Sequence, residues 1–325
     1  MKKEQQKAGF ASVFGNYAIW GVFLIEVAFF ALLSGGNFIS GNNIVNICRQ
    51  IAYYGIASVG MTFVILIGGI DLSTGSIITL VNMVCAYIMV NMGWNMWIAI
   101  LISLIVATLI GLINGVMIAH IGMPPLIATF ASQTVFEGFA FLITNGRPIS
   151  GFTKRFPAMN LFARWTIGPV PICAVIMAAC FAIGSFILNK SYFGRFFYAI
   201  GGNEDAAQLS GIPVNRMKLL IYALSGLFAG MAGIVLLSRS GSAQTTVGKG
   251  LEFDVITCVV LGGISVNGGV GRISGVVAGV LIIGSLTNGM ILLNISEYTQ
   301  MIIKGLVLAG AVGIDCAMSR RNRRA

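Results

Sequence analysis

The sequence is poor in charged residues. Asp, Glu, Lys and Arg make up 9% of its 325 residues, whereas about a quarter of the residues in a soluble protein carry charge. The shortage extends along the whole chain, which excludes a soluble domain held by a single membrane anchor. We therefore expect an integral membrane protein with many spans.

Residue types that build metal and catalytic centres are also scarce. The single histidine, His120, excludes a metal site made of several histidines and any catalytic triad that needs a histidine elsewhere. The six cysteines lie in or beside apolar segments without metal-ligand spacing, so we interpret them as buried free thiols. An intramembrane enzyme is disfavoured, because no paired His or Asp residues stand at catalytic spacing. We expect no enzymatic activity, no metal and no cofactor.

Nucleotide-binding motifs are missing as well. The chain has no G-x-x-x-x-G-K-(S/T) phosphate loop, so it cannot hydrolyse ATP by that device. The Gly-rich run 262–279 is not a dinucleotide fingerprint, because it follows an apolar span and lacks an acidic residue at the required distance. We interpret it as a place where helices cross closely through small residues.

Apolar residues, by contrast, make up 57% of the chain, and it contains 42 glycines. The mean hydropathy is +0.92. The apolar runs are about as long as a membrane-spanning helix, which predicts an all-α polytopic bundle forming one transmembrane domain over residues 1–325. We predict about ten spans, some of them broken or re-entrant. They lie near residues 17–34, 50–70, 77–92, 97–119, 125–143, 168–188, 219–238, 252–264, 274–293 and 298–315.

The basic residues predict how the chain is oriented. The first apolar run, 17–34, is long for the core of a signal peptide, so we favour an uncleaved span over a cleaved leader. An even number of spans places both termini on one side. Most basic residues outside the spans lie on that side, as expected for the cytoplasm. The loop 144–167 is the exception, because it places several basic residues outside.

The formal net charge of +10 does not indicate nucleic-acid binding. The basic residues stand at the ends of apolar runs and in the C-terminal segment 320–324. Positive-inside orientation and anionic lipid headgroups account for basic residues at such positions. We expect membrane lipid as a partner and no nucleic acid.

The longest polar interruption, residues 189–218, is predicted to be an ordered cytoplasmic loop. Its centre, from Asn203 to Leu209, has the pattern of a short amphipathic helix with Asn203 as N-cap. Glu204 and Asp205 lie in the first turn, where the helix dipole favours negative charge. Gly211 lies where the helix should stop. Joining two spans requires no such order, so we interpret the segment as a docking element.

A weak internal echo links two other segments. Residues 68–75 and 262–269 share the pattern G-G-I-x-(L/V)-x-x-G, and each interrupts an apolar run. Interrupted helices in two halves of a chain indicate the pathway of a transporter. Shared ancestry and chance similarity are both open in a chain so rich in glycine.

Four stretches, in this order and spacing, resemble the permease subunits of ribose-type ABC sugar importers. They are residues 60–76, 194–212, 259–279 and 298–315. One glycine-rich run alone would be weak support, whereas the ordered set is specific, and together the stretches extend over nearly the whole chain.

The resemblance implies a permease in the bacterial inner membrane that imports a monosaccharide, a ribose-like pentose or a hexose. It implies three partners: a cytoplasmic ABC ATPase of the tandem-cassette type, an extracytoplasmic sugar-binding protein, and a second permease copy or paralogue. It also implies that the inner loop carries the helix that couples the permease to the ATPase. The matching residues here are Gly201, Gly202, Asn203, Glu204, Asp205, Ala206, Ala207, Leu209 and Gly211.

Polar residues within the spans are the candidates for the translocation pathway. Charges at membrane depth cost several kcal/mol and mark functional sites; these are Glu26, Arg49, Asp71, Glu137 and Lys304. We expect Arg49 and Lys304 to pair with acids or to extend toward the interface. The candidate pathway residues are Asp71, Ser73, Asn82, Asn114, Gln133, Phe130 and Asn288. Helix capping by Asp71 or Ser73, and interhelical hydrogen bonds or packing by the others, are the competing interpretations.

Two further alternatives follow from the same residues. The outer loops 144–167 and 238–252 either dock a binding protein or are solvated beside lipid headgroups. Their basic residues are Arg147, Lys154, Arg155, Arg239 and Lys249. The chain could instead be an ion-coupled secondary sugar transporter that acts without an ATPase. Asp71, Glu137 or Lys304 would then form the ion relay, and the loop 189–218 would be a plain connector.

Overall fold

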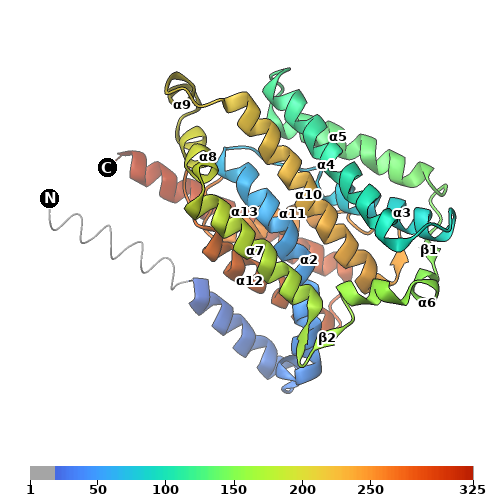
Figure 1. The fold of residues 1–325 in the computed structure, drawn as a ribbon. Helices are drawn as coiled ribbons and strands as arrows, with labels where there is room; N and C mark the ends of the chain where they lie inside the picture. The colour runs from blue at the N-terminus through green and yellow to red at the C-terminus, as the bar shows by residue number, and fades with distance from the viewer. Residues whose placement is uncertain (1–18, 325) are drawn as a thin grey trace.

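The computed structural model describes residues 19–324, most of them helical (Figure 1). The predicted N-terminal tail and the first two residues of the 17–34 span lie outside the described residues. The first helix is Ile19–Leu33. The other elements are η1 (Asn37–Ile39), α2 (Gly41–Leu66), α3 (Thr74–Val90), α4 (Met96–Ala119), α5 (Pro125–Leu142), β1 (Ile149–Ser150), α6 (Phe152–Arg155), η2 (Pro157–Phe162), β2 (Thr166–Ile167), β3 (Val170–Pro171), α7 (Ile172–Lys190), α8 (Tyr192–Gly202), α9 (Glu204–Leu209), α10 (Val214–Ser240), β4 (Ser242–Ala243), α11 (Leu251–Leu261), α12 (Ile273–Leu292) and α13 (Glu297–Arg324).

Each predicted span overlaps one of these helices. Among the described residues, α4, α5, α7, α10, α12 and the part of α13 from Glu297 to Ala317 are long and apolar enough to cross a membrane. The first helix and α3 are shorter apolar helices, and α11 has 11 residues. The all-α membrane fold is therefore confirmed. The number of crossings and the side on which each terminus lies stay predictions.

The core of the bundle forms around α2. Every residue of this helix from Ile51 to Leu66 is buried, which suits a helix that is apolar all round. It packs against α7, α10, α11 and α12, and α10 in turn packs along α3 and α4. Small residues allow these close crossings: a methyl group added at Gly226 of α10 would collide with the carbonyl oxygen of Ala107 of α4.

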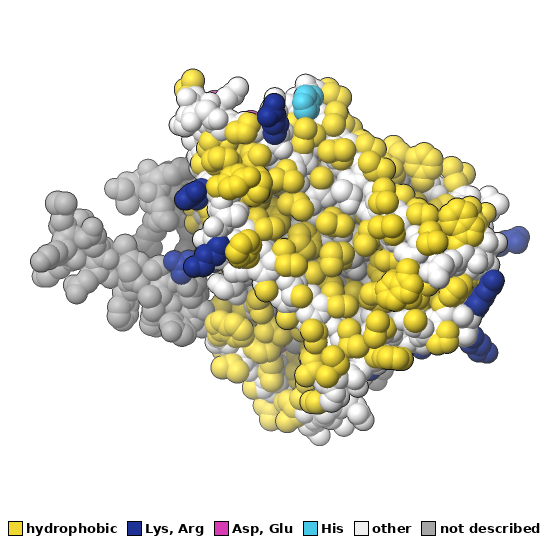
Figure 2. Space-filling model, viewed as in Figure 1, with side chains coloured by type: hydrophobic (Ala, Val, Ile, Leu, Met, Phe, Trp, Pro, Cys, Tyr) yellow, Lys and Arg dark blue, Asp and Glu magenta, His cyan; other side chains and the backbone are white. Residues whose placement is uncertain are grey.

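The peripheral helices present apolar side chains outward. Along α4, Leu101, Ile105 and Leu109 follow one another at helical spacing, and each is at least half exposed. Figure 2 shows a broad hydrophobic surface with basic side chains gathered toward its two ends. An outward apolar surface of this extent suits lipid contact.

The connections lie at two ends of the bundle. One end carries α8 and α9, and the other carries the short strands with α6 and η2 (Figure 1). Strand β1 pairs with β4 in antiparallel register, with Ile149 opposite Ala243, and β2 pairs with β3. The predicted outer loops 144–167 and 238–252 therefore meet at the same end.

The segment after β4 turns back into the bundle. The Gly248 amide donates a hydrogen bond of 3.0 Å to the Thr79 hydroxyl of α3, and the Gly248 backbone packs against Gly75. As a result, α11 begins beside the first turns of α3 and not at the end of the bundle. Its short length follows from this re-entrant approach.

Candidate functional site

Helix α9 forms as its sequence predicts. The Asn203 side chain accepts a 2.9 Å hydrogen bond from the Ala206 amide, and Glu204 and Asp205 occupy the first turn. The chain leaves the helix through Gly211 at a φ of 85°, a conformation that glycine adopts without strain. The predicted N-cap and C-terminal stop are both confirmed.

The side chains of α9 divide into an inward and an outward set. Ala207 is 4% exposed, so its side chain faces the bundle. Leu209 is 89% exposed at the tip of the segment. Glu204 forms a 2.6 Å ion pair with Lys218 at the start of α10, whereas Asp205 is exposed. Asp205 and Leu209 both lie on the exposed side of α9, where a protein partner has access to them.

Gly201, another residue of the predicted coupling set, lies where three backbone segments meet. The end of α8 at Gly201 touches the end of α2 at Leu66 and the loop after α11 at Gly269. A methyl group added at Gly201 would collide with the Leu66 carbonyl oxygen and the Gly269 nitrogen. Gly268 packs closely against Gly68 and Gly201. We call the five residues Leu66, Gly68, Gly201, Gly268 and Gly269 the glycine junction.

The glycine junction brings together the two segments that share the G-G-I pattern. Gly68 belongs to the first G-G-I segment, and Gly268 and Gly269 belong to the second. The loop after α11 is also held by α13, because Asp315 accepts hydrogen bonds of 3.1 Å from the Ser265 hydroxyl and the Val266 amide. The neighbouring run 262–279 packs α11 against α12 through Gly262, Gly275 and Gly279, which agrees with its interpretation as a helix crossing.

The break between α2 and α3 encloses a buried polar cluster. Asp71 is fully buried, and its carboxylate accepts hydrogen bonds from the Ser73 amide and hydroxyl at 3.0 and 2.6 Å. Its other oxygen accepts from Ser225 of α10 at 2.8 Å. Asn114 of α4 donates to the Ser73 hydroxyl at 2.8 Å. Three of the predicted pathway residues therefore meet here, in a cluster that holds the start of α3.

The remaining pathway candidates have other surroundings. Asn82 donates to the Gly233 carbonyl of α10 and Asn288 accepts from Asn43 of α2, both at 2.9 Å, so each links two helices. Gln133 donates to Glu137 at 3.3 Å and to Glu252 at 3.1 Å. Phe130 is 59% exposed on the outside of α5.

The charges within the spans find partners. Lys304 of α13 forms a 2.7 Å ion pair with Asp254 of α11, which confirms the expected acidic partner. Arg49 donates instead to the backbone carbonyl of Arg164 at 3.0 Å. Glu26 accepts a 2.8 Å hydrogen bond from Ser285 of α12. The sequence offered no partner for Glu26.

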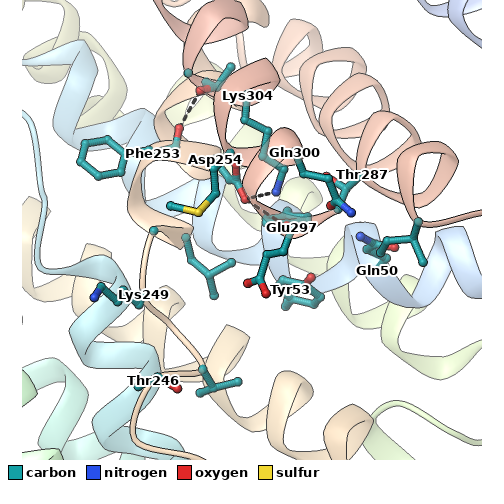
Figure 3. Close-up of a pocket in the computed structure, with 18 of the residues that line it drawn as sticks. Gln50, Tyr53, Thr246, Lys249, Phe253, Asp254, Thr287, Glu297, Gln300 and Lys304 are labelled. Atoms are coloured by element: carbon teal, nitrogen blue, oxygen red, sulfur yellow. Dashed lines mark hydrogen bonds and ion pairs between the residues drawn. The ribbon is translucent and has the colours of Figure 1, made fainter. Parts of the chain in front are cut away.

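A cavity of about 930 Å³ is lined by residues of α2, α11, α12 and α13 and of the segment that follows β4. Figure 3 shows Lys304 reaching from α13 toward Asp254, with Gln300 and Glu297 on the same helix. Tyr53 and Tyr54 of α2 also line it. The cavity could not be predicted from the sequence, although a lysine and an aspartate in apolar spans are a signal of pairing.

A family model described as the permease component of branched-chain amino acid transport systems matches residues 43–312. The chain belongs to this permease family. The permease is 42% identical to the ribose import permease of Bacillus subtilis (strain 168) over 97% of both chains. It is 42% identical to the ribose import permease of Escherichia coli (strain K12), over 90% of its own chain and 91% of that protein. The L-arabinose transport system permease of the same strain is 39% identical, over 93% and 90%.

No solved structure significantly matches the permease. The similarity to ribose import permeases extends over nearly the whole chain, so the permease is of the ribose type. With its apolar helices, it is a multi-pass protein of the inner membrane.

Proposed function

We propose that the permease is the translocation subunit of an importer that moves a monosaccharide into the cytoplasm and is driven by a separate ABC ATPase. The observation that carries the proposal is α9, an ordered and capped helix whose Leu209 is 89% exposed. The exposed Leu209 and the acidic first turn of α9 are both accessible to a protein partner. The chain has no phosphate loop, so the partner supplies ATP hydrolysis.

The substrate is a neutral pentose or a similar hexose. The relatives are named as permeases for ribose, L-arabinose and, at 33% identity, xylose. These three sugars are uncharged, and a permease for them needs hydroxyl-binding groups and no fixed net charge along its path.

The end of the bundle with α9 faces the cytoplasm, and both termini lie on that side. The ATPase is of the tandem-cassette type and meets a pair of permease chains, two copies or a copy with a paralogue. A sugar-binding protein docks at the opposite end. Exposed basic residues there, Arg147, Lys154, Arg155 and Lys249, would meet acidic groups on it.

The ion-coupled alternative is less well supported by the side-chain contacts. Asp71 accepts hydrogen bonds from Ser73 and Ser225, and Lys304 is paired with Asp254. These contacts tie both groups to neighbouring helices. A group that takes up and releases an ion during transport has to leave such contacts in each cycle.

The docking claim is tested with two variants that each add one negative charge to α9. Leu209→Glu removes the exposed apolar side chain, and Gln208→Glu alters the neighbouring exposed residue. We expect Leu209→Glu to abolish co-purification with the ATPase and ATP-driven D-ribose uptake, while Gln208→Glu retains both. Equal behaviour of Leu209→Glu and the unchanged chain would exclude α9 as the docking helix.

A further inference from the structure

The cavity beside α13 has an unusual lining for a membrane bundle. Among the described residues that line it are the charged side chains Arg239, Lys249, Asp254, Glu297 and Lys304. Lipid tails would not stabilise such groups, so the cavity is a place for water or a polar solute. Its size, about 930 Å³, falls in the range of small-molecule sites.

The Asp254–Lys304 pair leaves hydrogen-bonding capacity unused. The Oδ2 atom of Asp254 accepts from the Lys304 ammonium at 2.7 Å and from the Tyr54 hydroxyl at 3.1 Å. Its Oδ1 atom has no hydrogen-bond partner among the described residues and is not fully buried. An ammonium carries three donors, of which Lys304 uses one here. An acceptor and two donors therefore lie side by side at the cavity.

This arrangement matches adjacent hydroxyl groups. A vicinal diol can donate to the free carboxylate oxygen and accept from the free ammonium hydrogens at the same time. The pair has no net charge, so it does not select for an ionic solute. Hydrogen bonds that involve charged groups contribute about 1.5–3 kcal/mol each, which suffices for transient binding without trapping.

We propose that Asp254 and Lys304 form a transient subsite for a neutral sugar on its way through the permease, each contacting a hydroxyl group of the sugar. The subsite rests on the proposed function, because it names the groups that meet the imported sugar. Its place supports the proposal: Lys304 lies two turns into α13, about 10 Å along the helix from its start.

A purely structural ion pair is the competing explanation. Pairing neutralises both charges inside the bundle whether or not a sugar binds, and breaking it by a single substitution would destabilise the fold. The test therefore uses two double variants that avoid an unpaired charge. Asp254→Asn/Lys304→Gln removes both charges, and Asp254→Lys/Lys304→Asp exchanges them.

The assay contains the permease, its ATPase and its binding protein in proteoliposomes, with D-ribose as probe. We expect both double variants to retain ATP hydrolysis stimulated by the ribose-loaded binding protein. We expect the neutral variant to move at least about tenfold less ribose per ATP, the factor that corresponds to one lost hydrogen bond of about 1.4 kcal/mol. The exchanged variant should remain deficient, because a longer lysine at 254 and a shorter aspartate at 304 move the ammonium and the carboxylate away from the positions that meet the two hydroxyl groups.

Unchanged ribose transport per ATP in the neutral variant would overturn the subsite, and so would full recovery in the exchanged variant. A second measurement needs no ATPase. Thr246→Cys places a thiol in the cavity lining, and Ser150→Cys places a control thiol on β1. Millimolar D-ribose should slow labelling of the first variant by a hydrophilic thiol reagent but not of the second.

Equal labelling with and without ribose would also contradict the subsite. A failure of the proposed function has a different signature: the unchanged permease would then show no ATP-driven ribose uptake with its partners.

Discussion

The Gly269 amide donates a 2.8 Å hydrogen bond to the carbonyl oxygen of Leu66. Leu66 is the last residue of α2, and Gly269 lies in the loop between α11 and α12. Gly201 packs against both, at the end of α8 and only two residues before the N-cap of α9. A movement of α9 would therefore reach the end of α2, and through it the break that precedes α3. The backbone just before the proposed docking helix therefore lies against the end of α2 and against the second interrupted segment.

Gly201→Ala tests the glycine junction. The added methyl group collides with backbone atoms of Leu66 and Gly269, which cannot move as a side chain would. We expect a loss of stability of about 1–3 kcal/mol, read as a lower unfolding temperature in detergent, together with reduced sugar transport per ATP. Gly202→Ala is the matched control, because nothing lies within 4 Å of its added methyl group. Similar losses in both variants would argue against the junction.

Reversing the charge of the α9 first turn tests its role in coupling. Glu204→Lys/Asp205→Lys places two positive charges at a helix N-terminus and faces Lys218 with a like charge. We expect ATPase-coupled transport to be abolished while the protein remains folded and inserted. Gln208→Lys adds a single charge to the same exposed helix and should transport normally. Wild-type transport and co-purification by the double variant would contradict the coupling role.

Variants that break the hydrogen bond between Asn43 and Asn288 test whether Asn288 has a structural role. The two amides meet at 2.9 Å and both are buried. We expect Asn43→Ala and Asn288→Ala each to lower the unfolding temperature and to be non-additive in the double variant, with a coupling of about 0.5–1.5 kcal/mol. Transport per folded molecule should be unchanged. Additive stabilities with a specific loss of transport would assign Asn288 to the pathway.

The cluster around Asp71 gives a graded prediction. Ser225→Ala removes one donor to the carboxylate, and we expect a loss of about 1 kcal/mol in stability. Asp71→Ala leaves the donors of Ser73 and Ser225 without their acceptor, so a larger loss, about 2–4 kcal/mol, is expected. Unfolding temperatures in detergent show which of the two variants loses more stability. A greater effect from Ser225→Ala would show that the cluster does not centre on Asp71.

Local features were predictable from the sequence, and close approaches between distant segments were not. The α9 helix follows from Asn203, the acids after it and Gly211, all within nine residues. The G-G-I pattern that two segments share is visible in the sequence. The contacts of Gly268 with Gly68 and Gly201, however, depend on how three backbones pack. A glycine in the sequence indicates that another backbone approaches closely, but it does not identify the approaching segment.

The all-α membrane fold could be predicted from the sequence, whereas the pathway residues stay a prediction. Apolar length determines a membrane helix, whereas a helix that is apolar on all sides does not reveal which face points inward. Phe130 was assigned to the pathway and is 59% exposed on α5. Lys304 was singled out, but its partner Asp254 lies 50 residues away, and only the packing of α11 against α13 brings them together.

The source of energy is the central claim, and uptake into proteoliposomes tests it most directly. The measurement follows D-ribose accumulation by the permease, with and without its ATPase and ATP, under an imposed proton or sodium gradient. We predict accumulation only when the ATPase, ATP and the binding protein are all present, with no contribution from either ion gradient. Accumulation of ribose by the permease alone on a proton or sodium gradient would contradict the account.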